Sequence, residues 1–148
     1  MTGTPPFALD PADPVHAEVL ARLTTDQIGW FTTVRADGSP HAVPVWFLWH
    51  SGRLLVMSEP RTAKVSNVRR GSAALLHLHT RADGNGVVVL SGPAVVSDRT
   101  ATEWLPEIGE SYTAKYAEAM VAYGMGLEAI AEKFHVVIEL EPTDLQAW

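Results

Sequence analysis

The chain has 148 residues, of which 47% are hydrophobic and 19% charged, and its formal net charge is −6. This length fits one domain that buries roughly two thirds of the surface its unfolded chain exposes. The acidic balance argues against a nucleic-acid binder, and the absence of cysteine excludes disulfides, thiolate nucleophiles and cysteine-ligated zinc.

Residues 1–12 are rich in proline, small residues and aspartate. This composition predicts a flexible N-terminal arm, followed by a single domain at residues 13–148. The first residues carry neither the basic nor the apolar region of a signal peptide, and no apolar run approaches the roughly 18 residues that a spanning helix needs. We therefore expect a cytoplasmic protein with no membrane contact and no nucleic-acid partner.

A helix is predicted to begin at Asp13 and Pro14, an N-cap residue and a first-turn proline, and to continue through Leu23. Three strand-like segments rich in β-branched and aromatic residues follow, at 28–36, 40–50 and 53–58. The Asp-Gly and Ser-Gly pairs between them are hairpin signals, so the three segments are expected to form a three-stranded meander.

The next segment, PRTAKVSNVRRG at residues 60–71, has the composition of a short helix that Gly71 ends. It carries four of the eleven Lys and Arg residues of the chain, namely Arg61, Lys64, Arg69 and Arg70. No Asp or Glu appears between Glu59 and Asp83. An otherwise acidic chain therefore has one local island of positive charge.

Residues three apart share a face of a helix, so Arg61, Lys64 and Asn67 are expected to point together while Val65 and Val68 face the core. Cations beside the free N–H groups of a first helical turn suit a phosphate or a carboxylate. A solvated amphipathic helix whose charges keep it soluble is the alternative. The absence of neighbouring acidic residues favours a bound anion, because an unpaired cluster repels itself.

The remaining elements are predicted as strands at 73–79, 87–97 and 134–142 and a helical region at 98–132. The Gly92-Pro93 pair indicates a bulge or an edge position. Gly124 and Gly126 divide the helical region. With about seven strands joined mostly by hairpins, the sequence predicts a mainly β fold, an antiparallel barrel with peripheral helices.

The run from residue 28 to residue 71 resembles the split β-barrel family typified by pyridoxamine 5′-phosphate oxidase, whose members bind flavins or deazaflavins. It resembles most closely the actinobacterial branch that uses the deazaflavin coenzyme F420. The likeness is strongest over residues 25–97. The residues that carry it, in family order, are Pro40, Pro44-Val45-Trp46, Arg61, Lys64, Asn67 and Arg69-Arg70.

The resemblance implies an FMN-binding-like split barrel over residues 13–148 and a homodimer with two cofactor sites at the subunit interface, each built from both chains. It also implies which residues bind the cofactor. These are Val45 and Trp46 at the ring system, Ser58, Arg61, Lys64 and Asn67 at the phosphate, and Arg69 or Arg70 at the acidic tail.

The implied activity is that of an F420-dependent oxidoreductase, which transfers hydride between the reduced cofactor and a small unsaturated or quinone-like molecule. Because the cofactor supplies the chemistry, no obligatory catalytic triad is expected, and the proton could come from water or from His41, His77 or His79, among which the sequence does not choose. Two alternatives stay open. One is an FMN-binding oxidase or reductase on the same fold, and the other is a non-catalytic protein that binds a cofactor or a haem-type ligand.

Two further patterns have structural interpretations. His77 and His79 share a face of a predicted strand, a spacing that can chelate a transition metal, but no third ligand is evident and no metal site is predicted. Tyr112, Tyr116 and Tyr123 form a helical stripe. Packing is the expected role of this stripe, and substrate gating is the alternative.

Overall fold

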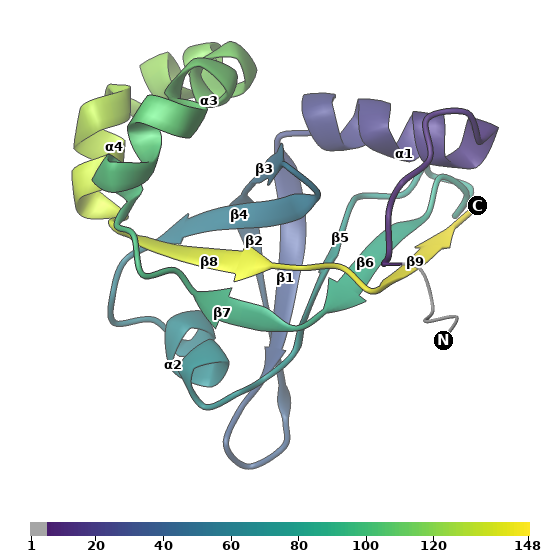
Figure 1. Cartoon of the computed structure of the whole chain (residues 1–148), viewed down its shortest axis with the longest axis horizontal. Coiled ribbons are helices and arrows are strands. Elements are labelled where there is room, and N and C mark those ends of the chain that lie inside the picture. Colours follow the sequence, from purple (N-terminus) through teal and green to yellow (C-terminus); the bar gives the residue numbers. More distant parts are fainter. Residues whose placement is uncertain (1–5) are drawn as a thin grey trace.

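The structure, a computed structural model, describes residues 6–148 as two antiparallel sheets and four helices (Figure 1). The helices are α1 (Pro14–Thr25), α2 (Ala63–Arg69), α3 (Ala101–Tyr123) and α4 (Leu127–Lys133). The strands are β1 (Ile28–Val34), β2 (Pro40–Trp46), β3 (Leu48–His50), β4 (Arg53–Ser58), β5 (Ala74–His77), β6 (Val88–Gly92), β7 (Ala94–Val96), β8 (Val136–Leu140) and β9 (Asp144–Ala147).

The two sheets have the strand orders β2-β1-β5-β6-β9 and β3-β4-β8-β7, and every strand pair is antiparallel. The chain passes from the first sheet to the second at Phe47, between β2 and β3. It does so again at Pro93, between β6 and β7. The result is the predicted mainly β architecture, a split antiparallel barrel with helices at its periphery.

The prediction of one strand over residues 40–50 and one over residues 87–97 is wrong. A strand that turns the corner between two packed sheets needs a bend, where its backbone stops pairing with its neighbours. Phe47 is fully buried at the first bend, and Gly92 and Pro93 form the second. Each predicted strand therefore continues from one sheet into the other.

The predicted three-stranded meander is corrected for the same reason. β1 pairs with β2 in one sheet, whereas β3 pairs with β4 in the other. Beyond the last predicted strand, β9 adds a further strand that pairs with β6 and completes the five-stranded sheet.

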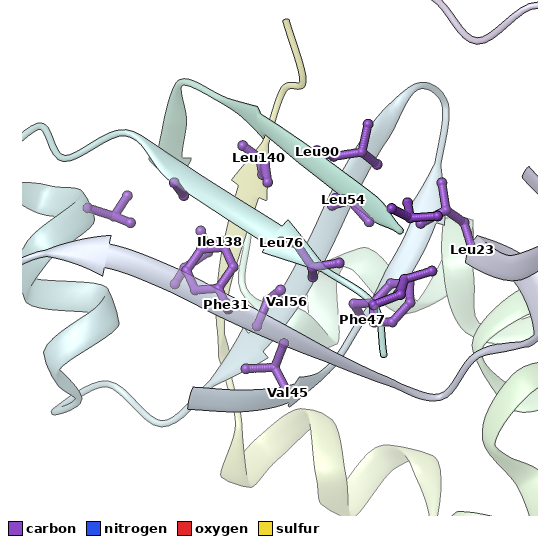
Figure 2. Close-up of a cluster of buried hydrophobic side chains, with 14 of the residues drawn as sticks. Leu23, Phe31, Val45, Phe47, Leu54, Val56, Leu76, Leu90, Ile138 and Leu140 are labelled. Atoms are coloured by element: carbon purple, nitrogen blue, oxygen red, sulfur yellow. The ribbon is translucent and has the colours of Figure 1, made fainter. Parts of the chain in front are cut away.

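The main hydrophobic core fills the space between the two sheets (Figure 2). Phe31 of β1 and Ile138 of β8 are fully buried there, one from each sheet. Leu23 of α1 joins this core, and Val65 and Val68 of α2 face it as predicted.

The β3-β4-β8-β7 sheet is covered on both faces. Along β4, Leu54 and Val56 belong to the main core, whereas Leu55 joins a second cluster that contains Ile108 and Met120 of α3. A strand buried on both sides reads as a continuous hydrophobic run instead of an alternating one. This explains the sequence of β4 and places α3 and α4 on the outer face of the sheet.

The predicted helical region divides where glycines were expected to divide it. Gly124 has a φ of 82° and ends α3 in the left-handed conformation, which glycine adopts without a steric penalty. Gly126 then caps α4. The break lets α4 fold back against α3, and both helices contribute to the second hydrophobic cluster.

The N-terminal segment is described from residue 6, so residues 1–5 of the predicted arm lie outside the described residues. Phe7 and Leu9 pack against the main core. Asp13 caps α1 as predicted, since its carboxylate accepts hydrogen bonds from the backbone of Val15 and His16 at 2.8 and 3.2 Å. Within residues 6–148, none of the helices has the length and apolar character needed to traverse a bilayer.

The second bend between the sheets, at Gly92 and Pro93, gives the first testable prediction. A Cβ atom at Gly92 would overlap the carbonyl oxygen of Glu141 and come within 3.0 Å of the backbone nitrogen of Thr143. Because backbone atoms cannot move aside as a flexible side chain can, Gly92→Ala is expected to lower the free energy of unfolding by about 2 kcal/mol. Chemical denaturation measures this change.

Gly126→Ala is the matched control for this substitution. A Cβ atom at Gly126 meets nothing within 4 Å, and its φ of −77° suits alanine. We expect a loss of about 0.5 to 1 kcal/mol, because alanine is less favourable than glycine at an N-cap. Equal losses in the free energy of unfolding for the two variants would contradict the close approach of Gly92 to the backbone of Glu141 and Thr143.

Candidate functional site

A cavity of about 260 Å³ lies where β2 and β4 meet the start of α2 and the α3–α4 pair. It brings together four of the predicted cofactor-binding residues, which are Val45, Trp46, Ser58 and Lys64. Figure 1 shows α2 and the α3–α4 pair at separate places beside the β4–β8 sheet. The cavity is therefore bounded by a basic segment and by an aromatic helical wall.

The aromatic wall comes mostly from residues that the sequence analysis did not assign to the site. Tyr112 and Tyr123 of α3 and Phe134, the C-cap of α4, line the cavity together with Trp46. The rings of Trp46 and Tyr116 stack with centroids 4.7 Å apart and planes 8° apart. Tyr123 meets Trp46 edge-on at 5.9 Å. One face of the Trp46 indole is thus covered by protein.

Tyr116 explains how α3 is held in this position. Its hydroxyl accepts a hydrogen bond from the backbone N–H of Phe47 at 2.8 Å. It lies 2.8 Å from the carbonyl oxygen of Phe47 and 2.7 Å from that of Gln27, the two acceptors for its single proton. The bend between β2 and β3 lacks ladder hydrogen bonds, and Tyr116 supplies partners for its buried backbone groups.

Lys115 binds the same bend from the neighbouring position of α3. Its ammonium donates hydrogen bonds to the carbonyl oxygens of Leu23 and Phe47, both at 3.0 Å, and lies 3.5 Å from the centroid of the Phe47 ring. Burial lowers the pKa of Lys115 to about 8 from its ordinary value of 10.5, and Asp26 opposes this shift. Lys115 and Tyr116 together anchor α3 to the barrel.

Lys64 is the cation that faces the cavity. It lies in the first turn of α2, which begins at Ala63, inside the segment 60–71 that was predicted as helical. Within residues 6–148 the Lys64 ammonium makes no salt bridge and no hydrogen bond. Burial lowers the pKa of Lys64, while the charge of Glu59 partly opposes the shift. A partly buried charge without a partner is unfavourable, and an anion in the cavity would supply one.

The other predicted phosphate ligands do not line the cavity of this chain. Arg61 and Arg70 are exposed. Asn67 is only 3% exposed, and its amide donates to the Thr33 hydroxyl at 2.9 Å and accepts from Arg70 at 2.5 Å. Asn67 therefore lies beneath α2 and does not share the face of Lys64, contrary to the spacing argument. Phosphate contacts for these three residues stay a prediction.

Ser58 closes the segment between β4 and α2. Its hydroxyl donates to the carbonyl oxygen of Glu59 at 2.8 Å and lies 3.0 Å from the Thr62 hydroxyl. Ser58 is 1% exposed, and both Glu59 and Thr62 line the cavity with it. These contacts order the turn that leads from the end of β4 to Lys64.

Several cavity residues had no chemical signal in the sequence, namely Met57, Glu59, Thr62, Ile130 and Phe134, whereas Tyr112 and Tyr123 had substrate gating only as the alternative to packing. The helical spacing of the tyrosines was visible, but spacing does not show which side chain borders a cavity. For the histidines, β5 ends at His77, and His79 lies beyond it. Across residues 6–148, no cluster of three or more His, Asp or Glu side chains could hold a metal ion.

Comparisons with known proteins agree with this architecture. The sequence model of the family described as pyridoxamine 5′-phosphate oxidase matches residues 15–148. No curated protein matches the chain significantly.

Three similar solved structures are each less than 25% identical to this chain and so show the fold alone. An F420 reductase is 20% identical, with 85% of this chain and 94% of that one covered and a TM-score of 0.58. Protein Rv2991 from Mycobacterium tuberculosis is 19% identical, with 98% and 89% covered and a TM-score of 0.63. HutZ, the haem storage protein from Vibrio cholerae, is 12% identical, with 90% and 94% covered and a TM-score of 0.63.

The buried position of Lys115 predicts a pH dependence of stability. Below pH 8 the amine is charged in both the folded and the unfolded chain. As the pH rises from 8 toward 10, the folded chain loses a proton that the unfolded chain still holds, so rising pH favours the folded state. Melting temperatures measured across this range are expected to rise in the wild type relative to Lys115→Met, which has no proton to lose.

Burial raises the pKa of Tyr112 and Tyr116 in the folded chain above the ordinary value of 10. Their titration in the unfolded chain near pH 10 is common to both proteins and cancels when the wild type is compared with Lys115→Met. Parallel curves for the wild type and Lys115→Met would show that the Lys115 amine is not desolvated in the folded protein.

Proposed function

The chain belongs to the pyridoxamine 5′-phosphate oxidase family, and on that premise we propose that it is an F420-dependent oxidoreductase. It transfers hydride between the reduced deazaflavin and a small unsaturated or quinone-like molecule. The proposal includes a homodimer and a cytoplasmic location. The observation that carries it is the unpaired ammonium of Lys64, which faces a cavity with aromatic walls.

The residues present fit the two chemical parts of the cofactor. Lys64 suits the phosphate of the side chain, because an ammonium forms charge-assisted hydrogen bonds with phosphate oxygens. Val45, Trp46 and Met57 provide an apolar surface for a planar ring. The same cavity therefore offers an anion site and a ring site within one chain.

The size of the cavity supports a site shared between two chains. At about 260 Å³ it lies below the roughly 300–1,000 Å³ of typical ligand pockets, and it cannot hold a cofactor and a substrate together. Arg61 and Arg70 are exposed near the same segment, and although Arg70 donates a hydrogen bond to Asn67, both could still meet an acidic tail or a second chain. In this proposal the partner subunit completes the substrate side.

The chain contributes position and desolvation rather than an acid–base residue. When bound, the deazaflavin would supply a ring carbon that carries the hydride. Tyr116 and Lys115 hold α3 so that its aromatic side chains exclude water from one side of the ring. By binding the phosphate, Lys64 would fix the position of the ring in the cavity.

Two alternatives share these residues. FMN also carries a phosphate and a planar ring, so Lys64 and Trp46 suit it equally well. A non-catalytic ligand-binding protein is supported by the likeness to a haem storage protein. No histidine lines the cavity formed by residues 6–148, and therefore no imidazole is placed there to ligate haem iron.

A cofactor comparison tests the proposal directly. We expect F420 to raise the melting temperature more than FMN or FAD at equal concentration, since a ligand at a hundredfold excess over its Kd adds about 2.7 kcal/mol of stability. Reduced F420 should then transfer hydride to menadione faster than in a protein-free control, as followed by absorbance. A larger increase in melting temperature with FMN would identify FMN, not F420, as the cofactor. Cofactor binding without hydride transfer to any member of a panel of quinones and enones would identify a non-catalytic binding protein.

The role of Lys64 is tested by Lys64→Gln. Loss of one charge-assisted contact at a partly solvated site is expected to raise the Kd for F420 about 10-fold. Calorimetric titration measures this change. Arg81→Gln removes the same charge from an exposed loop residue that pairs with Asp83, and it should leave the Kd unchanged. Equal Kd values for wild type and Lys64→Gln would overturn the placement of the phosphate.

A further inference from the structure

The Tyr112 hydroxyl is a second polar group in the cavity without a protein partner. Tyr112 is 3% exposed and lines the cavity. Its hydroxyl forms no hydrogen bond within residues 6–148, and desolvation is the single cause of its pKa shift. His41 Nδ1 is the one fully buried side-chain polar atom of these residues that lacks a partner. The Tyr112 hydroxyl is therefore not fully enclosed by protein, and because Tyr112 lines the cavity we infer that the hydroxyl faces it.

Tyr116, one helical turn further along α3, shows what a structural tyrosine looks like at this site. Its ring packs beside that of Tyr112, with centroids 4.9 Å apart, but its hydroxyl is used by the backbone of Phe47 and Gln27. If packing were the only role of Tyr112, phenylalanine would fill the same space without a hydroxyl group. The hydroxyl of Tyr112 is thus left for a ligand.

Lys64 and Tyr112 both line the cavity, one from α2 and the other from α3. We propose that the Tyr112 hydroxyl donates a hydrogen bond to a carbonyl oxygen of a planar ring whose anionic group binds Lys64. The cavity then selects planar anions that carry a neutral acceptor on the ring and discriminates against hydrocarbon rings with the same charge. This inference deepens the proposed function and rests on its placement of the anion at Lys64.

The protonation state of Tyr112 fits a donor role. Burial raises the pKa of the phenol, so Tyr112 stays neutral and keeps its proton throughout the physiological range. A phenol is also a better donor than acceptor, because its oxygen lone pair is delocalised into the ring. A site that hydrogen-bonds a ligand rejects an analogue without the matching group, because the partner inside the cavity is then left unpaired.

Two stable probes separate the anion contact from the carbonyl contact. Anthraquinone-2-sulfonate and anthracene-2-sulfonate share a planar tricyclic body and a sulfonate, but only the first has ring carbonyl oxygens. We expect the wild-type protein to bind the quinone more tightly in calorimetric titrations. Tyr112→Phe should weaken binding of anthraquinone-2-sulfonate by about 3- to 10-fold, the range of one neutral hydrogen bond, and leave the Kd of anthracene-2-sulfonate unchanged.

The stability of the variants provides a second readout. Tyr112→Phe should leave the melting temperature of the free protein unchanged or raise it, because the hydroxyl has no protein partner and its burial is unfavourable. Tyr116→Phe is the matched control and should lower the melting temperature, since it leaves the backbone groups of Phe47 without their partner. A lower melting temperature for Tyr112→Phe would assign its hydroxyl to the fold and overturn the inference.

The outcomes distinguish this inference from the proposed function. If Lys64→Gln weakens both probes equally while Tyr112→Phe changes neither Kd, the anion site stands and the role of Tyr112 is wrong. If the wild-type protein binds neither probe at millimolar concentration, the cavity is no site for planar anions, and both proposals fail. Selective loss of the quinone in Tyr112→Phe supports the inference whether or not F420 proves to be the cofactor.

Discussion

The site depends on how the chain is held where it crosses between the two sheets at Phe47. A strand that leaves one sheet for another has backbone groups that no neighbouring strand can pair, and here they are buried. Tyr116 and Lys115, adjacent residues on α3, bind the N–H and carbonyl groups of Phe47. The same contacts that satisfy the bend fix α3 against the barrel, and so they place the aromatic wall of the cavity.

The second hydrophobic cluster makes this arrangement stable. Because the β3-β4-β8-β7 sheet is apolar on both faces, it needs a cover outside the barrel, and α3 and α4 provide it. The short α4 returns along α3 after Gly124, which brings Phe134 back to the cavity beside Tyr123. The packing of α3 and α4 therefore both buries the outer face of the sheet and forms one wall of the cavity.

Charge distinguishes the cavity from an ordinary apolar depression. The chain is acidic overall, yet Lys64 stands partly buried without an ion pair, and Tyr112 has an unpaired hydroxyl in the same cavity. Only the charge of Glu59 partly offsets the desolvation of Lys64, and the Tyr112 hydroxyl has no hydrogen-bond partner, so the burial of both polar groups is unfavourable. A ligand that supplies the missing partners would remove this cost, which supports the proposed planar anion with a ring acceptor.

The sequence alone determined the mainly β class, the cap of α1, the glycine break after α3 and the inward face of Val65 and Val68, because local patterns set each of these. It also pointed to Val45, Trp46, Ser58 and Lys64, which the structure gathers at one cavity. Tertiary structure alone decided that residues 40–50 bend into two sheets and that Asn67 is enclosed beneath α2. It also brought Tyr112 to the cavity. Spacing along a helix tells which residues share a face, whereas what that face meets depends on contacts between distant parts of the chain.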